Sequence, residues 1–401
     1  MNRITDNILY KVEKPARYIG GELNEIIKDL DDIDIHFAFC FPDVYEVGMS
    51  HLGTRILYHT INQREDTYCE RVFAPWPDME EQLRKNNISL YSLETKTPLK
   101  EFNIIGFTLQ YEMSYTNILN MLDMSKIPFR ASERGENDPI IMAGGPCAYN
   151  PEPLTEIIDF FELGEGEEMM NDVLEVYKKY QNKWDKKAFL REISHIRGIY
   201  VPSLYDVSYN EDGTIKEFKP KYEDVPAKVK KRIVADFDKV EFPENIIVPY
   251  TDIVHDRVVL ETFRGCTNGC RFCQAGMIYR PVREKTRETL EEQARKLIAN
   301  TGYQEISLSS LSTCDYSDIQ RLIHELMEEH SKKKVAVALP SIRVDAFSVD
   351  LIKEIQKVKK TGLTFAPEAG SQRMRDIINK GLTEEKILEA SRSAFEAGWS
   401  S

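Results

Sequence analysis

Short apolar runs alternate with amphipathic stretches between residues 31 and 180, and the alternation predicts strands and helices in turn. Residues 33–41 (IDIHFAFCF) are apolar at nearly every position, which predicts a strand buried on both faces. Residues 50–62 place Leu52, Ile56 and Ile61 at helical spacing. Further strands are predicted at 88–93, 103–109, 139–143 and 159–163, and further helices at 78–86, around 118–122 and at 167–180. This pattern predicts an α/β fold with a doubly wound, Rossmann-like parallel sheet.

The alternation stops at residue 181 and resumes at 257. Between them, the Asn210–Gly213 turn joins two short β-type runs at 205–209 and 214–218, which predicts a hairpin within a connector. After 257, the pattern predicts strands at 257–262, 304–309, 334–339 and 362–366, and helices at 286–300, 316–330, 347–359 and a pair within 371–397. These elements form four βα units of a partial barrel. Because a closed barrel needs more strands, we expect this chain to be part of a longer one.

Four regions follow from these patterns. They are an N-terminal segment at 1–30, a Rossmann-like domain at 31–180, a connector at 181–256 and a partial (βα) barrel at 257–401.

Composition narrows the class of protein. The net charge of −13 disfavours nonspecific binding to nucleic acid or membranes. A basic run (Lys228, Lys230, Lys231 and Arg232) is typical of a solvated linker, with local RNA contact as the alternative. The chain has no apolar run of about 18 residues and no signal-peptide pattern at its start, so we expect no membrane association and a cytoplasmic location.

Three of the seven cysteines form a tight cluster, Cys266-x3-Cys270-x2-Cys273, directly after the first predicted barrel strand. The carboxyl ends of barrel strands carry the chemistry in such folds. Three thiolates can hold three irons of a [4Fe-4S] cluster and leave the fourth iron open to another ligand. A zinc or non-catalytic iron–sulfur module is the alternative, with Cys314 or His255 as a fourth ligand.

This spacing, with Phe272 between the last two cysteines, resembles the signature of radical SAM enzymes. The resemblance implies that S-adenosylmethionine (SAM) binds the open iron and is cleaved to a 5′-deoxyadenosyl radical. It also implies an electron donor such as flavodoxin or ferredoxin, with a small molecule, protein or RNA as substrate. By the same resemblance, Phe272 packs near the adenine or the cluster, and the SAM site lies at the ends of three further strands. Its residues there are Ser309, Ser341, Arg343 and Glu368, where Ser309 stands in place of the family's Gly-Gly-Glu-like motif.

The first domain carries a second resemblance. Asp43-x-Tyr45-x-x-Gly48 resembles the Asp-x-His-x-x-Gly motif of cobalamin-binding domains, with Tyr45 in place of the histidine that binds cobalt. A phenol, with a pKa of about 10, is a poor ligand for cobalt at neutral pH, and His51 is a further candidate. Glycines at two predicted strand ends (Gly144, Gly145, Gly164 and Gly166) would let a ligand approach the backbone.

Together with the segment Pro15–Glu22, these features resemble B12-binding-domain-type radical SAM proteins of an uncharacterised subgroup. The resemblance implies cobalamin-dependent methyl transfer or a related modification. The alternative is a degenerate N-terminal domain that binds substrate in place of cobalamin.

Overall fold

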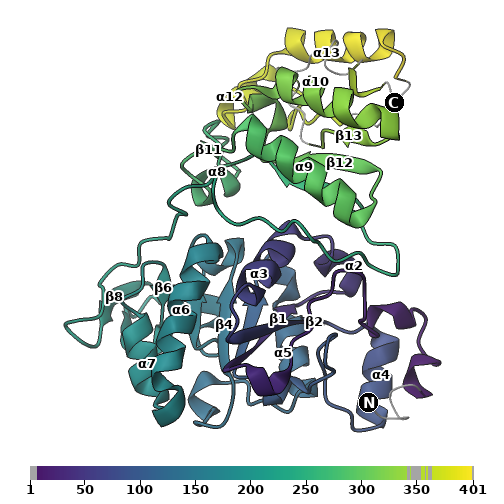
Figure 1. Ribbon diagram of the computed structural model, residues 1–401. Helices are drawn as coiled ribbons and strands as arrows, with labels where there is room; N and C mark the ends of the chain where they lie inside the picture. Colours follow the sequence, from purple (N-terminus) through teal and green to yellow (C-terminus); the bar gives the residue numbers. More distant parts are fainter. Residues whose placement is uncertain (1–6, 341–343, 345–353, 357, 360–363, 400–401) are drawn as a thin grey trace. The chain divides into compact units, whose positions relative to one another are not determined.

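The structure, a computed structural model, describes residues 7–340, 344, 354–356, 358, 359 and 364–399 (Figure 1). The chain divides into two compact units. The first comprises Met1–Ala235, Glu241–Pro243 and Ile247–His255, and the second comprises Asp236–Val240, Glu244–Ile246 and Asp256–Ser401. Among the described residues, no helix is both long enough and apolar enough to cross a membrane.

The first unit is built on a six-stranded sheet of order β2-β1-β3-β4-β5-β6. All neighbouring strands are parallel except β5 and β6, so the prediction of a doubly wound parallel sheet is confirmed. The central strand β1 is buried at all seven positions, as its apolar sequence predicts. The strands are β1 (Ile35–Phe41), β2 (Thr67–Phe73), β3 (Ile104–Thr108), β4 (Ile140–Gly144), β5 (Phe160–Glu162) and β6 (Ile199–Tyr200).

Helices cover both faces of this sheet (Figure 1). Helices α3 and α6 pack side by side, while Arg84 of α4 forms an ion pair of 2.7 Å with Asp123 of α5. The helices are α2 (Tyr45–Gly48), α3 (Leu52–Asn62), α4 (Pro77–Lys85), α5 (Tyr115–Met124), α6 (Gly166–Tyr180) and α7 (Lys186–Ile193).

Two elements of the first unit differ from the sequence prediction. Strand β2 was not predicted, because Glu70 and Arg71 interrupt its apolar pattern although both are fully buried. The strand predicted at 88–93 is wrong: this stretch is an irregular segment, and Tyr91 makes only an isolated bridge with Pro98. Its apolar side chains belong to the core and produce a strand-like pattern without a sheet partner.

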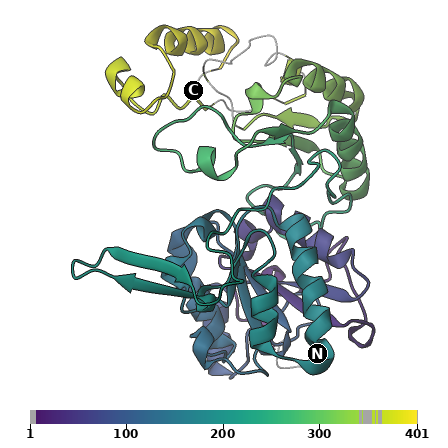
Figure 2. The same ribbon diagram turned by 90° about the vertical axis from the view of Figure 1, so that its left-hand side faces the viewer.

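The predicted hairpin is present. Strands β7 (Tyr205–Tyr209) and β8 (Ile215–Pro220) pair antiparallel and project from the first unit (Figure 2). The turn closes where the Gly213 N–H donates to the carbonyl of Asn210 at 3.0 Å. Gly213 has a φ of +81°, which glycine adopts without steric cost.

The second unit contains a parallel sheet of order β13-β12-β9, which matches the first three βα units of a partial barrel. The predicted strand at 362–366 is not a strand at its described residues 364–366, and its other residues, like most of the helix predicted at 347–359, lie outside the described residues. The elements are β9 (Val258–Glu261), β10 (Phe263–Arg264), α8 (Ala275–Ile278), β11 (Arg283–Glu284), α9 (Arg287–Thr301), β12 (Glu305–Ser309), α10 (Ile319–His330), β13 (Ala336–Ala338), α12 (Gln372–Ile377) and α13 (Glu384–Glu396).

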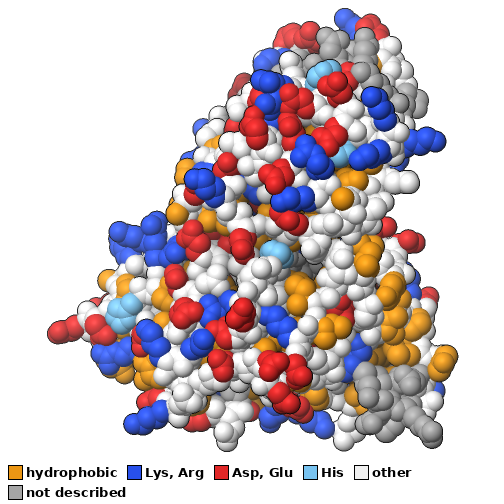
Figure 3. Space-filling model, viewed as in Figure 1, with side chains coloured by type: hydrophobic (Ala, Val, Ile, Leu, Met, Phe, Trp, Pro, Cys, Tyr) orange, Lys and Arg blue, Asp and Glu red, His pale blue; other side chains and the backbone are white. Residues whose placement is uncertain are grey.

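The outer surface of α9 and α10 carries interspersed acidic and basic side chains (Figure 3). Arg287 pairs with Glu325 at 2.6 Å and Arg295 pairs with Glu329 at 2.8 Å, so the two helices are cross-linked by ion pairs. This is the solvated side of βα units, and the sheet lies beneath it.

Candidate functional site

The three clustered cysteines lie in the loop that follows β9 and β10, at the carboxyl end of a strand of the second unit. Their side chains are half-exposed, and each is a free thiol. Within the loop, the N–H of Cys273 donates to the carbonyl of Cys270 at 3.1 Å, which turns the chain back between these two residues. The other cysteine of the second unit, Cys314, lies in a 3₁₀ turn after β12.

Residues 377–379, at the end of α12, form hydrogen bonds with this cysteine loop. The N–H of Arg271 donates to the carbonyl of Ile378 at 2.9 Å, and the side-chain amide of Asn379 donates to the carbonyl of Gly269 at 2.9 Å. Gly269 has a φ of +67°, a left-handed conformation that glycine tolerates. The sequence analysis missed Asn379, because nothing in the local pattern links it to a loop about 110 residues earlier.

The donor set of the loop fits an iron–sulfur cluster. Three thiolates from one short segment suit iron, and half-exposure leaves them accessible. In the described part of the chain, no three His, Cys, Asp or Glu side chains are gathered closely enough to hold a metal ion, so cluster binding would draw the three sulfurs together. Phe272 is 55% exposed between two of them.

The structure places two of the predicted SAM-site residues in the second unit. Ser309 ends β12, and its carbonyl accepts from the N–H of Thr262 at 3.0 Å. Glu368 has a φ of +66° and forms an ion pair with Lys380 at 3.1 Å. Ser341 and Arg343 lie outside the described residues.

A buried arginine shapes the segment around Glu368. The guanidinium of Arg375 donates to the carbonyls of Ala369 and Gly370 at 2.9 and 3.1 Å, and to that of Leu382 at 2.8 Å. These bonds tie the turn before α12 to the segment after it. Arg375 and Lys380 were not predicted from the sequence, because both stand in a stretch that reads as an ordinary charged helix.

Tyr45 lies in the first unit, directly after β1, but its phenol faces the protein interior. The side chain is 1% exposed, packs edge-on against Phe73 and donates its hydroxyl hydrogen to Glu22. Glu22 in turn pairs with Arg71 at 2.7 Å. The Tyr45 hydroxyl is therefore engaged in a buried ionic cluster.

Gly48 and His51 also have structural tasks. A Cβ at Gly48 would lie 2.3 Å from the Phe73 ring, so only glycine fits there. His51 caps the start of α3, and its Nδ1 accepts from the N–H of Thr54 at 3.1 Å.

The four glycines at the carboxyl edge of the sheet do not share one role. Gly145 has a φ of +103°, and a Cβ there would lie 2.8 Å from Gln110. Gly164 has a φ of +127°, and a Cβ would lie 2.1 Å from the carbonyl oxygen of Arg232, with which Gly164 forms a β-bridge. The close approach that Gly164 permits is therefore to the protein's own backbone.

Gly144 and Gly166 flank a buried acid that the sequence analysis missed. Glu162 ends β5, is 4% exposed, and its Oε1 has no hydrogen-bond partner among the described residues. Burial, and secondly the charge of Glu167, raises the pKa of Glu162 to about 8. The carboxyl is therefore mostly protonated at neutral pH and has a hydrogen to donate.

We expect Glu162→Gln to stabilise the protein at high pH and to have little effect at low pH. The folded-state pKa of about 8 lies above the ordinary value of 4.5, so the wild-type acid costs stability above pH 8 and none below pH 4.5. Each pKa unit corresponds to ~1.4 kcal/mol, so the gain at pH 8.5 should exceed ~1 kcal/mol. Urea unfolding at pH 5 and 8.5 measures it, and an equal gain at both values contradicts the prediction.

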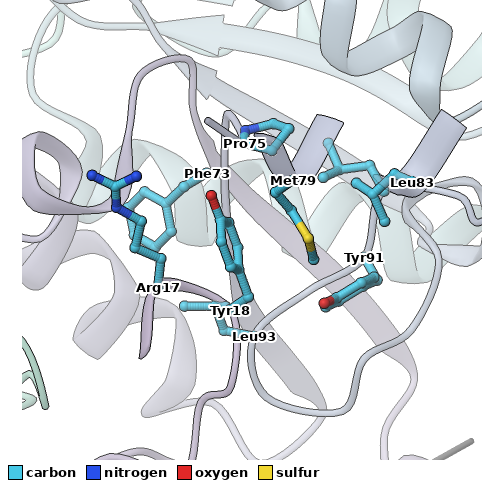
Figure 4. Close-up of a pocket in the computed structure, with 9 residues that line it drawn as sticks. Arg17, Tyr18, Phe73, Pro75, Met79, Leu83, Tyr91 and Leu93 are labelled. Atoms are coloured by element: carbon cyan, nitrogen blue, oxygen red, sulfur yellow. The ribbon is translucent and has the colours of Figure 1, made fainter. Parts of the chain in front are cut away.

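A small apolar pocket lies in the first unit, where the segment Pro15–Glu22 packs against the chain after β2 (Figure 4). Tyr18 from this segment stands beside Phe73, and Arg17 carries its guanidinium at one end. Arg17 forms a bidentate ion pair with Glu46 of α2, with N–O distances of 2.8–2.9 Å. The lining of this pocket contains none of the candidate cofactor residues.

Comparison with known proteins agrees with this arrangement. Residues 53–202 match the family described as Radical SAM proteins, N-terminal, and residues 260–401 match the Radical SAM superfamily. The two matched families are both radical SAM families and together cover most of the chain, so the chain belongs to the radical SAM superfamily, as the sequence resemblance implied.

Among curated relatives, an uncharacterized protein of Methanocaldococcus jannaschii is 28% identical over 357 residues, which cover 88% of this chain and 65% of the relative. A putative methylthiotransferase of the same organism is 28% identical over 148 residues, which cover 35% of this chain and 33% of the relative.

Two solved structures share the fold. The cobalamin-dependent SAM radical enzyme OxsB, with aqua-cobalamin and SAM bound, has a TM-score of 0.56 at 17% identity, over 90% of this chain and 47% of OxsB. The methyltransferase TsrM from Kitasatospora setae, with cobalamin and a [4Fe-4S] cluster bound, has a TM-score of 0.59 at 11% identity, over 90% of this chain and 65% of TsrM. This chain thus spans 65% or less of the length of each of these four proteins.

Proposed function

We propose that this protein is a radical SAM enzyme whose cluster is held by Cys266, Cys270 and Cys273. The observation that carries the proposal is the loop itself: three half-exposed free thiols, at the carboxyl end of a barrel strand, in a segment pinned by Asn379 and Ile378. When bound, the cluster would supply the electron that breaks a sulfur–carbon bond of SAM. An electron-transfer protein such as flavodoxin or ferredoxin would provide that electron.

The chain's own residues then bind and shield the reactants. Phe272 projects from the loop, where its ring can cover the cluster and keep water away. We expect Glu368 to accept hydrogen bonds from the SAM ribose, and its ion pair with Lys380 and the turn held by Arg375 would keep the carboxylate in place. By the sequence resemblance, Ser309, Ser341 and Arg343 would complete the SAM site.

Anaerobic reconstitution tests this assignment. The wild-type chain should bind about four irons and produce 5′-deoxyadenosine from SAM when reduced with dithionite. A protein that takes up zinc but no iron, or binds four irons and never cleaves SAM, would support the binding-module alternative.

For the first unit we propose cobalamin as the ligand and methyl transfer, or a related modification, as the reaction. The fold shared with two cobalamin-bound enzymes supports this, as does Glu162 at the carboxyl edge of the sheet, where a protonated carboxylic acid can donate to an amide carbonyl. Because the Tyr45 phenol bonds Glu22, we expect no cobalt ligand from this position.

Titration with hydroxocobalamin tests the proposal. The wild-type protein should bind it with a base-off spectrum, and Tyr45→Phe should leave that spectrum unchanged. An intact protein with a filled iron–sulfur cluster that binds no cobalamin would favour the alternative, in which the first unit binds part of the substrate.

We also place the protein in the cytoplasm, where a reducing environment keeps cluster-binding thiols available. In the described part of the chain, none of its seven cysteines forms a disulfide bond, which supports this location.

A further inference from the structure

The loop that carries the three cysteines also carries a hydrogen-bond donor aimed at one of their sulfurs. The side-chain nitrogen of Asn268 lies 3.3 Å from Sγ of Cys266. The same nitrogen lies 3.4 Å from Oδ2 of Asp315. Both neighbours are acceptors, and an amide nitrogen has two hydrogens, so it can serve the two at once.

We propose that Asn268 tunes the reduction potential of the cluster by donating a hydrogen bond to the Cys266 thiolate, and that Asp315 orients its amide. This inference rests on the proposed function, because it concerns the cluster that Cys266 would bind. Asn268 is not a ligand here: it acts on the electron density of a ligand. Hydrogen bonds to cluster sulfurs are among the features through which a protein sets the potential of an iron–sulfur centre.

The position of the donor is fixed by the backbone around it. Asn379 donates to the carbonyl of Asn268 at 3.3 Å and to that of Gly269 at 2.9 Å. The N–H of Arg271 bonds the carbonyl of Ile378 at 2.9 Å. Hydrogen bonds hold the main chain on both sides of Gly269. The short Asn268 side chain is therefore restricted in position, and its amide nitrogen lies beside Sγ of Cys266.

Asp315 comes from a different strand end. It lies in the 3₁₀ turn after β12, 47 residues beyond Asn268. A carboxylate that accepts one amide hydrogen polarises the amide and directs the other hydrogen, which strengthens the bond to sulfur. Cys314 precedes Asp315 in this turn. The turn contacts the cysteine loop through the Asp315 carboxylate, and this contact does not involve the Cys314 thiol.

The direction of the effect follows from charge. Reduction adds an electron to the cluster and its thiolates, and a donated hydrogen bond stabilises the more negative state. Removing the donor should therefore make the cluster harder to reduce. We expect Asn268→Leu, which keeps the approximate shape and removes the donor, to lower the equilibrium constant for reduction by up to about tenfold. For a one-electron couple, tenfold equals ~59 mV.

The test is an anaerobic redox titration of the reconstituted full chain with dithionite, followed by electron paramagnetic resonance, with iron content measured for each variant. Asn268→Leu should bind about four irons and show a more negative midpoint. Asn268→Ala, which removes the same donor with a smaller side chain, should shift the midpoint in the same direction. Thr267→Ala is the matched control, since Thr267 is an exposed neighbour in the same loop, and its midpoint should equal that of the wild type.

An Asn268→Leu protein with full iron content and an unchanged midpoint overturns the inference. Should that variant lose its iron, Asn268→Ala decides, and an unchanged midpoint in a filled Asn268→Ala protein overturns the inference as well. A wild-type chain that binds no iron is a different result, because it refutes the proposed function itself.

Discussion

Replacing any one of Cys266, Cys270 and Cys273 with alanine is expected to abolish SAM cleavage and to reduce bound iron from about four per chain to near none. With only two thiolates left, the cluster keeps too few protein ligands. The three cysteines lie within eight residues of one loop, and no other cysteine stands in that loop to replace a lost one. Iron content after anaerobic reconstitution and 5′-deoxyadenosine formation measure the loss.

Cys314→Ala is the matched control. Cys314 is equally half-exposed in the second unit but lies in the turn after β12. This variant should keep the full iron content and the wild-type rate of SAM cleavage. Loss of the cluster in Cys314→Ala together with its retention in Cys266→Ala would make the ligand assignment wrong.

Arg71→Met is expected to lower the free energy of unfolding of the first unit by ~3–5 kcal/mol. Arg71 is 1% exposed and forms ion pairs with Glu22 at 2.7 Å, Glu25 at 2.9 Å and Glu94 at 2.6 Å. Methionine fills much of the space but leaves three buried carboxylates without their cation. Urea unfolding followed by circular dichroism measures the change.

The same substitution at a surface arginine provides the control. Arg84 also pairs with two acids, Glu80 and Asp123, but its side chain is 44% exposed. We expect Arg84→Met to cost less than ~1 kcal/mol, because solvent screens these pairs. Equal losses in the two variants would show that the Arg71 cluster contributes no more than a surface pair.

The loss in Arg71→Met should also be smaller at low pH. Burial raises the pKa of Glu94 to about 7 even with Arg71 present, since desolvation outweighs the attraction of the cation. The pKa of Glu94 in the folded protein lies above its ordinary value of 4.5. The charged Glu94 carboxylate therefore lowers the free energy of unfolding above pH 7, and this cost disappears as the pH falls towards 4.5. Comparing the two proteins at pH 5 and pH 8 checks this, and a loss independent of pH would contradict it.

The fold could be predicted from the sequence wherever the local pattern of apolar and polar residues matches the positions that are buried and exposed. The continuous apolar run of β1 predicts a buried strand, and the helical spacing in α3 predicts a helix. The cysteine spacing indicates an iron–sulfur loop without any knowledge of the fold. Strand β2 was not predicted because its two buried charged residues, Glu70 and Arg71, are paired with residues from distant segments. A pattern-based prediction treats such charges as solvent-exposed, and only their partners make their burial possible.

Local sequence pattern was enough to predict the class of this protein: a Rossmann-like sheet, then βα units, with three clustered cysteines in a loop after a strand. These features depend on residues close together in the chain, so periodicity and spacing reveal them. Four contacts became visible only in the folded chain: Tyr45 bonds Glu22, Gly164 approaches Arg232, and Asn379 and Asp315 bond the cysteine loop. Each of these contacts joins segments that are far apart in sequence. Whether a glycine admits a ligand or the protein's own backbone depends on which segment the fold brings to it, and no local pattern carries that information.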